Sequence, residues 1–316
     1  EFADYNRIGE TWIHPFTVSN SKDEEMTGLT CHSQLPLDIY KSHPDFINDN
    51  YILPNMRSTR YTEPDEQQEN EDIRYVGYHI DAAKYAQLLK EESLKRSNLK
   101  LVDAHVADIA VKDENVTSLV LNNGEIITAD IFVDCTGFRA LLANAVGAEW
   151  DTSYSKRLFV DTALAVQLPY RDRSTQMRNT TYCHALQNGW VWNVPLQTRI
   201  GTGYVYSSKH TSDDDARMEF KEHLSKMYGY DKEELTFRKL DFGVGIRPES
   251  WKNNVVAVGL SSFFLEPIES TAISTMHYQI STLYDMIIND YILPKDKISR
   301  FNSVNKMAVD AIASYI

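Results

Sequence analysis

Two stretches of the sequence carry residues whose types and spacing could do chemistry. In residues 251–273, a short apolar run that predicts a buried strand ends at Gly259, and Glu269-Ser270-Thr271 then opens a segment with helical spacing. A strand that leads through a turn into a helix presents backbone N–H groups that can bind an anion. Glu269 adds a carboxylate that could act as an acid or a base. The alternative is an ordinary connection in which Ser270 or Thr271 caps the helix.

The second stretch is a strand-like segment with two large aromatic rings. Alternation along residues 189–195 places Trp190, Trp192 and Val194 on one face of a strand and the intervening side chains on the other. For a Trp-x-Trp pair taken alone, packing in a core is the simplest interpretation. A functional interpretation of the two tryptophans therefore depends on the motif in which they lie.

The elements before these stretches are predicted from periodicity. Residues 78–95 have apolar side chains at helical spacing, with Asp81 as the N-cap. Residues 105–111 and 116–127 alternate as strands. Asn123-Gly124 predicts a hairpin turn within the second of these segments, with positive φ at both turn positions.

A further buried strand is predicted at residues 131–133, followed by a turn that opens the next helix. Cys135 in that turn is interpreted as a small buried packing residue. Strands are also predicted at residues 158–168 and 200–206, and an acidic amphipathic helix with a solvated face at residues 213–227.

Two motifs resemble those of a known family. Residues 259–273, GLSSFFLEPIESTAI, resemble the G-L-x-S-x-F-L-E-P-L-E-S-T-[GS]-I signature of the flavin-dependent halogenases, in particular the tryptophan halogenase group. Phe263 and Ala272 replace residues that are commonly Gly in the family, and Ala272 keeps its backbone N–H. Residues 190–195, WVWNVP, resemble the family's W-x-W-x-I-P, with Val194 in place of Ile.

This resemblance implies a fold of the α/β (α+β) class. We expect a flavin monooxygenase-like FAD-binding fold with a mixed substrate-side β-sheet and a helical cover. Residues 1–316 would form a single unit that is incomplete. The expected parts are FAD-side portions at 78–150 and 251–290, a substrate-side sheet with helices at 151–245, and an irregular cover or insertion at 17–70.

The resemblance also implies roles for individual residues. Thr271 and Ala272 would bind a halide through their backbone N–H groups, and Glu269 would be the catalytic acid or base. The remaining expected site residues are the cofactor contacts Val106, Leu260 and Ile273 and the substrate-side residues Trp190, Trp192, Pro195 and Ser270. No metal ligands are expected.

The activity implied by the resemblance is halogenation. Reduced FAD (FADH2), O₂ and chloride or bromide would give hypohalous acid, which would halogenate an electron-rich aromatic, indole-like or phenol-like substrate. A separate flavin reductase is expected as a partner, and a homodimer is compatible with the family. The family's catalytic lysine, which follows a G-x-G-x-x-G fingerprint, has no counterpart in these residues, and the last residues stop inside an expected helix. The chain therefore looks truncated at both ends.

Two other functions stay open at this point. One is an FAD-dependent aromatic hydroxylase (monooxygenase), which shares the fold. Trp190-x-Trp192 and the Glu269-Ser270-Thr271 turn argue against it. The other is a non-catalytic remnant or binding module.

Composition excludes several classes of partner. The net charge of −13 over 316 residues argues against nucleic acid and against anionic membrane surfaces. No apolar run is long enough to span a bilayer. The three cysteines have no close spacing, so they predict neither a disulfide framework nor a metal site, and a cytoplasmic location is expected.

Overall fold

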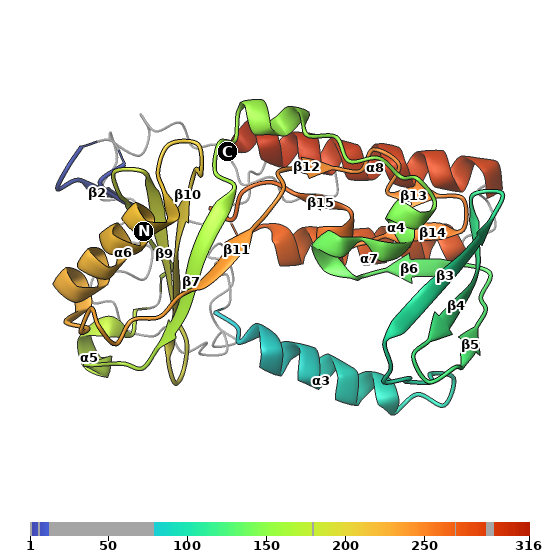
Figure 1. Cartoon of the computed structure of the whole chain (residues 1–316), viewed down its shortest axis with the longest axis horizontal. Coiled ribbons are helices and arrows are strands. Elements are labelled where there is room, and N and C mark those ends of the chain that lie inside the picture. The colour runs from blue at the N-terminus through green and yellow to red at the C-terminus, as the bar shows by residue number, and fades with distance from the viewer. Residues whose placement is uncertain (1, 6, 13–78, 179, 269, 289–293) are drawn as a thin grey trace, which may run out of the picture. The chain divides into compact units, whose positions relative to one another are not determined.

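The computed structural model describes residues 2–5, 7–12, 79–178, 180–268, 270–288 and 294–316 (Figure 1). The chain forms two compact units. Unit 1 comprises Glu1–Leu89 and Ala163–Leu240, and unit 2 comprises Lys90–Thr162 and Asp241–Ile316. Each unit is thus assembled from two separate stretches of sequence.

Unit 1 is built on a seven-stranded sheet in the order β11-β7-β10-β9-β8-β1-β2. The strands are β1 (Phe2–Ala3), β2 (Thr11–Trp12), β7 (Thr162–Leu168), β8 (Tyr182–Ala185), β9 (Gly189–Pro195), β10 (Ile200–Tyr206) and β11 (Arg238–Asp241). β1 runs parallel to β8, whereas β8, β9 and β10 pair antiparallel. A short helix, α5 (Arg173–Gln176), lies between β7 and β8 in the chain.

Helix α6 (Asp213–Tyr228) covers one face of this sheet, as Figure 1 shows. Phe220 and Leu224 pack against Val191, Tyr204 and other side chains of β9 and β10 in one buried cluster. The predicted acidic helix is therefore confirmed. Its acidic side faces solvent and its apolar side is part of a core.

The ends of α6 are set by its sequence. The Ser212 hydroxyl accepts a hydrogen bond from the Asp215 N–H, and three aspartates occupy the first turn, where the helix dipole favours negative charge. Gly229 ends the helix with φ of 72°, in the left-handed conformation that glycine adopts most readily.

Unit 2 combines small sheets with helices. Its elements are α3 (Ala82–Leu94, which begins in unit 1), β3 (Val106–Lys112), β4 (Asn115–Leu121), β5 (Ile126–Ile127), β6 (Phe132–Asp134), η2 (Gly137–Arg139), α4 (Leu141–Ala145), η3 (Ser153–Lys156), β12 (Gly245–Ile246), β13 (Trp251–Lys252), β14 (Val255–Ala257), η4 (Gly259–Ser261), β15 (Phe263–Phe264), α7 (Ala272–Ile288) and α8 (Pro294–Tyr315). β14 pairs antiparallel with β13 and parallel with β6.

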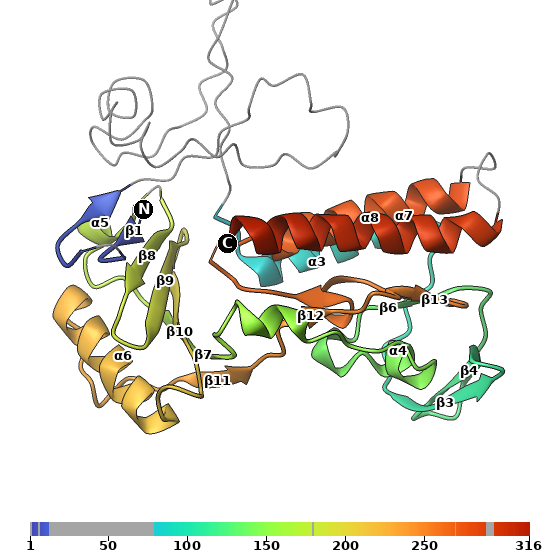
Figure 2. The ribbon, with the colours of Figure 1, turned by 90° about the horizontal axis from the view of Figure 1, so that it is seen from above.

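The core of unit 2 lies between this central sheet and the last two helices. Helices α7 and α8 run side by side in Figure 2 and contact each other. Trp251 and Val256 from the sheet pack with Leu283 of α7 and Phe301 of α8 in one buried cluster. The mixed α/β class predicted from sequence is confirmed.

Three local predictions needed correction. In the hairpin of β4 and β5, Gly124 has a positive φ and donates to Leu121 O at 2.9 Å, whereas Asn123 has no positive φ. This pattern is a type I turn closed by a left-handed glycine, with one positive φ where two were expected. Strand β7 begins at Thr162, later than predicted.

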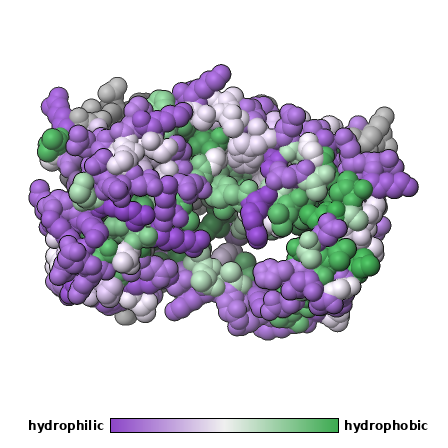
Figure 3. Space-filling model, viewed as in Figure 1, coloured by the Kyte–Doolittle hydropathy of each residue, from purple (hydrophilic) through white to green (hydrophobic). Residues whose placement is uncertain are grey.

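Cys135 was the third error, because it is exposed. Val133, on the preceding strand β6, is also 47% exposed, and Asp134 between them is buried. Figure 3 shows apolar residues gathered over the part of unit 2 that carries β3 and β6. The side of β6 that bears Val133 therefore does not face a core formed by the described residues.

Helix α3 confirms the predicted helix, and Asp81 caps it by accepting from the Ala83 N–H at 3.2 Å. None of its residues is buried against the described part of the chain. Among the helices that the structure describes, none is long and apolar enough to cross a membrane. The predicted division into FAD-side and substrate-side portions stays a prediction.

Candidate functional site

The first candidate site lies in unit 2, at the turn that follows β14. Val255 and Ala257 are fully buried, and the chain then turns at Gly259, whose φ is 63°. A side chain would be strained in this left-handed backbone, which explains the glycine. The next residue, Leu260, is 37% exposed although it is apolar.

Gln279 fastens this turn to helix α7. Its Oε1 accepts from the Gly259 N–H at 2.8 Å, and its Nε2 donates to Ser262 Oγ at 3.0 Å. Ser262 Oγ lies 2.8 Å from Ser250 Oγ. All three side chains are buried, so each hydrogen bond is made where water cannot replace it.

Arg247 holds the same turn from the other side. Its backbone N–H donates to Ser262 O at 2.7 Å, and its Nε donates to Ser261 O at 2.9 Å. The rest of the guanidinium donates to Ala148 O and, at 2.6 Å, to Asn144 Oδ1. Burial lowers the pKa of this guanidinium from its usual value. Its donors are matched to fixed acceptors, as a buried cation requires.

Asp134 completes the buried polar network. Its carboxylate accepts from the backbone N–H groups of Thr136, Leu142 and Ala143, each at 2.9 Å. Ser261 Oγ lies 3.3 Å from the same carboxylate. Asp134 is fully buried, and these donors stabilise its negative charge, together with the charge of the nearby Arg247 guanidinium. Gln279, Arg247 and Asp134 together fix the backbone between residues 259 and 262.

The predicted halide site lies at the start of α7. Ser270 has φ of 53°, a left-handed conformation that is uncommon for a residue with a side chain. Thr271 O accepts from the Thr275 N–H at 2.9 Å, as the first carbonyl of the helix should. No acceptor among the described residues pairs with the N–H groups of Thr271 or Ala272. These two N–H groups are available to a ligand as far as the described residues go.

The remaining predicted residues of unit 2 are apolar and partly accessible. Ile273 in the first turn of α7 is 38% exposed, which is close to the value for Leu260. Val106 begins β3, opposite Leu121, and is half-buried. Glu269, the predicted acid or base, lies outside the described residues. The structure thus ties the turn to α7 at Gln279, and it places Val106 on a different sheet.

The second candidate site lies in unit 1, on β9. Trp190 and Trp192 project from the same face of the strand, with ring centroids 6.3 Å apart and planes at 62°. Trp190 is buried and Trp192 is half-buried. The predicted alternation is confirmed, because Val191 and Asn193 point to the opposite face. There Val191 packs in the α6 core and Asn193 donates to Tyr228 Oη at 2.8 Å.

Sequence reasoning missed a histidine that holds the end of this motif. His79 Nδ1 lies 3.0 Å from Pro195 O, so it carries the proton and donates to the carbonyl. Its Nε2 lies 3.1 Å from Thr181 Oγ1. Burial lowers the pKa of His79, which favours the neutral ring. The nearby pair Arg199 Nη1–Asp81 Oδ2, at 2.9 Å, ties the same end of β9 to α3.

A second cluster of titratable groups lies under α6. His184 Nε2 is 2.9 Å from Asp4 Oδ2, and its Nδ1 is 3.1 Å from Tyr182 Oη. The ring of His223 on α6 lies 4.8 Å from the His184 ring. Burial lowers the pKa of His223 to about 4, and its Nε2 is buried without a partner among the described residues. Nothing in the sequence pattern indicated this cluster.

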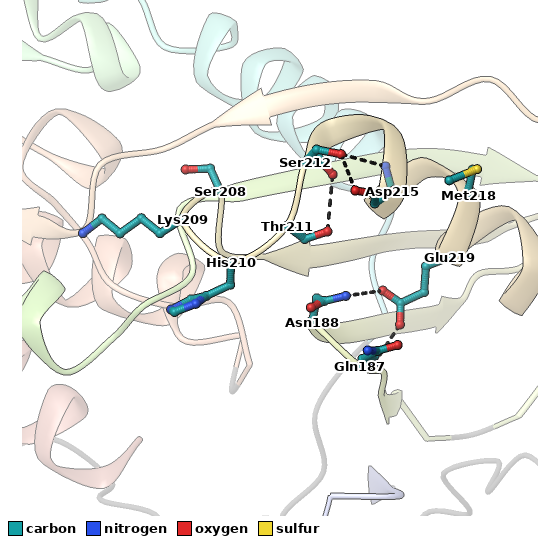
Figure 4. Close-up of a pocket in the computed structure, with 10 residues that line it drawn as sticks. All are labelled: Gln187, Asn188, Ser208, Lys209, His210, Thr211, Ser212, Asp215, Met218 and Glu219. Carbon is teal, nitrogen blue, oxygen red and sulfur yellow. Dashed lines mark hydrogen bonds between the residues drawn. The ribbon is translucent and has the colours of Figure 1, made fainter.

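A hollow of about 770 Å³ opens between the β8–β9 turn and the start of α6 (Figure 4). Its lining is mostly hydrophilic, and several of the polar groups already pair with one another. Glu219 accepts from the Gln187 N–H at 2.8 Å and from Tyr204 Oη at 2.6 Å, and Ser212 caps α6. None of the predicted site residues is among the ten that line it. In the described part of the chain, no group of three or more His, Cys, Asp or Glu could hold a metal.

Comparison with known proteins identifies the family. The tryptophan halogenase family model matches residues 1–316, which is the whole chain given. The chain belongs to the tryptophan halogenase family. The resemblance read from the two motifs is thereby confirmed.

Relatives within the tryptophan halogenase family cover most of this chain. Tryptophan 7-halogenase KtzQ from Kutzneria sp. (strain 744) is 31% identical over 269 residues, which are 81% of this chain and 48% of that protein. The structure of tryptophan 6-halogenase SttH from Streptomyces toxytricini is similar with a TM-score of 0.78 at 29% identity, covering 99% of this chain and 61% of that one.

A third relative is described by its cofactor. Xcc4156, a flavin-dependent halogenase from Xanthomonas campestris, is 33% identical with a TM-score of 0.67, covering 75% of this chain and 46% of that one. The chain spans about half the length of the curated relatives it matches.

Proposed function

We propose that the protein is a flavin-dependent halogenase that acts on an electron-rich aromatic, indole-like or phenol-like, small molecule. The observation that carries the proposal is the start of α7. Within a member of the tryptophan halogenase family, two N–H groups without acceptors among the described residues open a 17-residue helix behind a left-handed Ser270.

Thr271 and Ala272 would hold the halide. The N–H groups and the dipole at the start of a helix favour negative charge, and both residues are half-buried, which limits competition from water. The polar network of Gln279 and Arg247 holds the adjoining turn rigidly. A rigid site favours an ion because little ordering remains to be done when the ion binds.

The turn also fits a flavin ring. Leu260 and Ile273 present apolar side chains that are 37% and 38% exposed, so they offer an apolar surface against which a planar ring could pack. The backbone of Val106 would meet the adenine end of FAD. When bound in its reduced form, FAD would supply the reaction of O₂ that oxidises the halide.

Glu269 would take the ring proton and stabilise the positive charge that develops on the aromatic substrate. Trp190 and Trp192 would screen that substrate from direct oxidation at the flavin, with Pro195 ending the strand that carries them. These roles come from the family resemblance, and the rigid placement of both rings on β9 supports them.

A flavin reductase would be the protein partner, because a halogenase consumes reduced FAD in every turnover. A cytoplasmic location, where reduced flavin is available, and a homodimer complete the proposal. The net charge of −13 fits a small-molecule substrate better than a nucleic acid or an anionic membrane.

The test uses bromide with the enzyme in its full length. Crystals with bromide and FAD should show anomalous scattering at the Thr271 and Ala272 amides, and mass spectrometry should show a brominated aromatic product. Glu269→Gln should lower the halogenation rate about 100-fold or more and leave FAD affinity unchanged. Glu249→Gln, at an exposed glutamate of the same unit, is the matched control.

Product that gains oxygen and no halogen would make the protein a hydroxylase and overturn the proposal. Full halogenation by Glu269→Gln would remove Glu269 from its role without affecting the halide site.

A further inference from the structure

The indole of Trp192 rests on a neighbouring strand that has no side chain beneath it. Trp192 pairs with Gly203 in the antiparallel ladder of β9 and β10, and Val194 pairs with Gly201. Directly paired residues project to the same face of a sheet. On the face that carries the two indoles, β10 therefore presents glycines opposite Trp192 and Val194.

The ring fills the space that a side chain at Gly203 would need. A Cβ placed there would overlap Cζ2 and Cη2 of Trp192 and would lie 2.6 Å from Leu164 O on β7. Real Cβ contacts are essentially never shorter than 3.0 Å. The benzene half of the indole thus lies directly on the backbone of β10.

Gly201 provides a contrast on the same strand and face. A Cβ at this position would have Val194 O at 3.9 Å as its nearest neighbour, which is an ordinary contact. Neither Gly201 nor Gly203 has a positive φ. Backbone conformation therefore does not require glycine at either position, and close approach requires it only at Gly203.

We propose that Gly203 is a positioning residue for Trp192. The missing side chain lets the indole fold across β10, and this placement sets its edge-on arrangement with Trp190 at 6.3 Å. The backbone under the ring is fixed from the other side, where Thr202 Oγ1 donates to Trp192 O at 2.6 Å. Any larger residue at position 203 turns the indole away from the sheet.

This inference rests on the proposed function for its consequence. If Trp192 screens the aromatic substrate from oxidation at the flavin, moving the indole opens that path. The fraction of turnovers that give halogenated product then falls, and oxygenated product or hydrogen peroxide rises. Gly203 itself touches neither substrate nor cofactor in this account.

The experiment compares Gly203→Ala with Gly201→Ala in the full-length enzyme. Two indoles at this separation and angle couple electronically, and the pair gives a circular dichroism couplet in the indole absorption band. Among the described residues it is the one contact between two tryptophan rings. Trp192→Phe abolishes the couplet and defines the baseline.

Gly203→Ala should lose at least half of the couplet, whereas Gly201→Ala should retain it. In product analysis, Gly203→Ala should shift turnover several-fold from halogenated product towards oxygenated product and peroxide. An unchanged couplet in folded Gly203→Ala overturns the inference. A lost couplet with unchanged products would support Gly203 as the residue that positions the indole. The same result would contradict the proposed role of Trp192 in screening the substrate.

Leu164 O also approaches position 203, so the Gly203→Ala protein could unfold for that reason alone. The thermal unfolding temperature separates the two causes through a double-mutant cycle with Trp192→Phe. A phenyl ring lacks the far end of the indole, so Gly203→Ala should lower the unfolding temperature much less in the Trp192→Phe background. An equal drop in both backgrounds assigns the clash to Leu164 and overturns the inference.

Discussion

Ala272 is the residue at which the proposed halide site can be probed with the least disturbance. As the first residue of α7, it has an N–H that the helix itself does not use. Proline is well tolerated at this position, because its fixed φ suits a helix start and its missing N–H costs no helical bond.

We therefore predict that Ala272→Pro raises the KM for bromide about 10-fold or more while α7 stays folded. Removing one donor to a charged group in a partly buried site costs about 1.5–3 kcal/mol. Halide titrations of steady-state turnover, with far-ultraviolet circular dichroism for the fold, measure both effects. Ala272→Gly keeps the N–H and should keep the KM. An unchanged KM in Ala272→Pro would place the halide elsewhere.

The lowered pKa of His223 makes the free energy of unfolding depend on pH. Its pKa is about 4 in the folded state, lowered first by burial and then by the charges of His184 and Lys226, with Asp4 opposing. The unfolded value is near 6.5. Between these values the unfolded chain binds more protons than the folded one. Stability contributed by neutral His223 is therefore complete above pH 6.5 and is lost as the pH falls towards 4.

His223→Gln should remove part of this dependence. The wild-type free energy of unfolding should fall by up to about 1.4 kcal/mol more per pH unit than that of the variant between pH 6.5 and 4. Urea unfolding at half-unit pH steps gives the two curves, and the common titration of the carboxylates cancels in the difference. Parallel curves would show that the pKa of His223 is the same in the folded and unfolded states, which would contradict the effect of its burial.

At the scale of elements, α6 is defined by its two ends. Gly229 has φ of 72° and no atom within 4 Å of the position of a Cβ, so only the backbone conformation requires glycine. Gly229→Ala should lower the free energy of unfolding by about 1 kcal/mol. Gly229→Asn should cost less, since Asn tolerates the left-handed region. Chemical denaturation measures both, and equal costs would refute a conformational origin.

Some features of the helices and strands could be predicted from the sequence, and others depend on the whole fold. The faces of β9 and the helix α6 were predictable because alternation and helical spacing are local properties. The exposure of Cys135 was not, because it depends on which part of the chain covers β6. Gly201-x-Gly203 opposite Trp192 and Val194 was a readable signal, but interpreting it needs the register of β9 and β10, which only the fold supplies.

In the candidate site, the motif residues could be predicted from the sequence, whereas the residues that hold them in place could not. The motif residues were found from the family resemblance. Their supports, Gln279, Arg247 and His79, were not found, because each makes its contacts across long sequence separations. Arg247 reaches Ala148 and Asn144, and His79 reaches Pro195. A single sequence offers no signal for such pairs.

At the scale of the whole molecule, each unit has a core of its own. Phe220 is fully buried in the α6 core of unit 1, and Phe301 is fully buried in the α8 core of unit 2. Replacing a buried phenylalanine with alanine costs about 3–5 kcal/mol. The two residues therefore form a matched pair for asking how independent the units are.

We predict that Phe220→Ala speeds amide hydrogen exchange chiefly in unit 1, and that Phe301→Ala speeds it chiefly in unit 2. Hydrogen exchange followed by mass spectrometry under native conditions resolves the two sets of peptides. A uniform increase over both units in either variant would show that the chain unfolds as one cooperative body.

The parallel pairing of β6 with β14 joins Phe132 to Val255, and the whole second stretch of unit 1 lies between these residues in the chain. On a ribosome that adds about 5–20 residues per second, β6 emerges on the order of ten seconds before the strand that completes its ladder. Unit 1 can close within this interval, and β3, β4 and β5 can pair with one another, whereas β6 must wait for β14. Synthesis thus exposes β6 of unit 2 to chaperones and to aggregation for longer than the strands of unit 1.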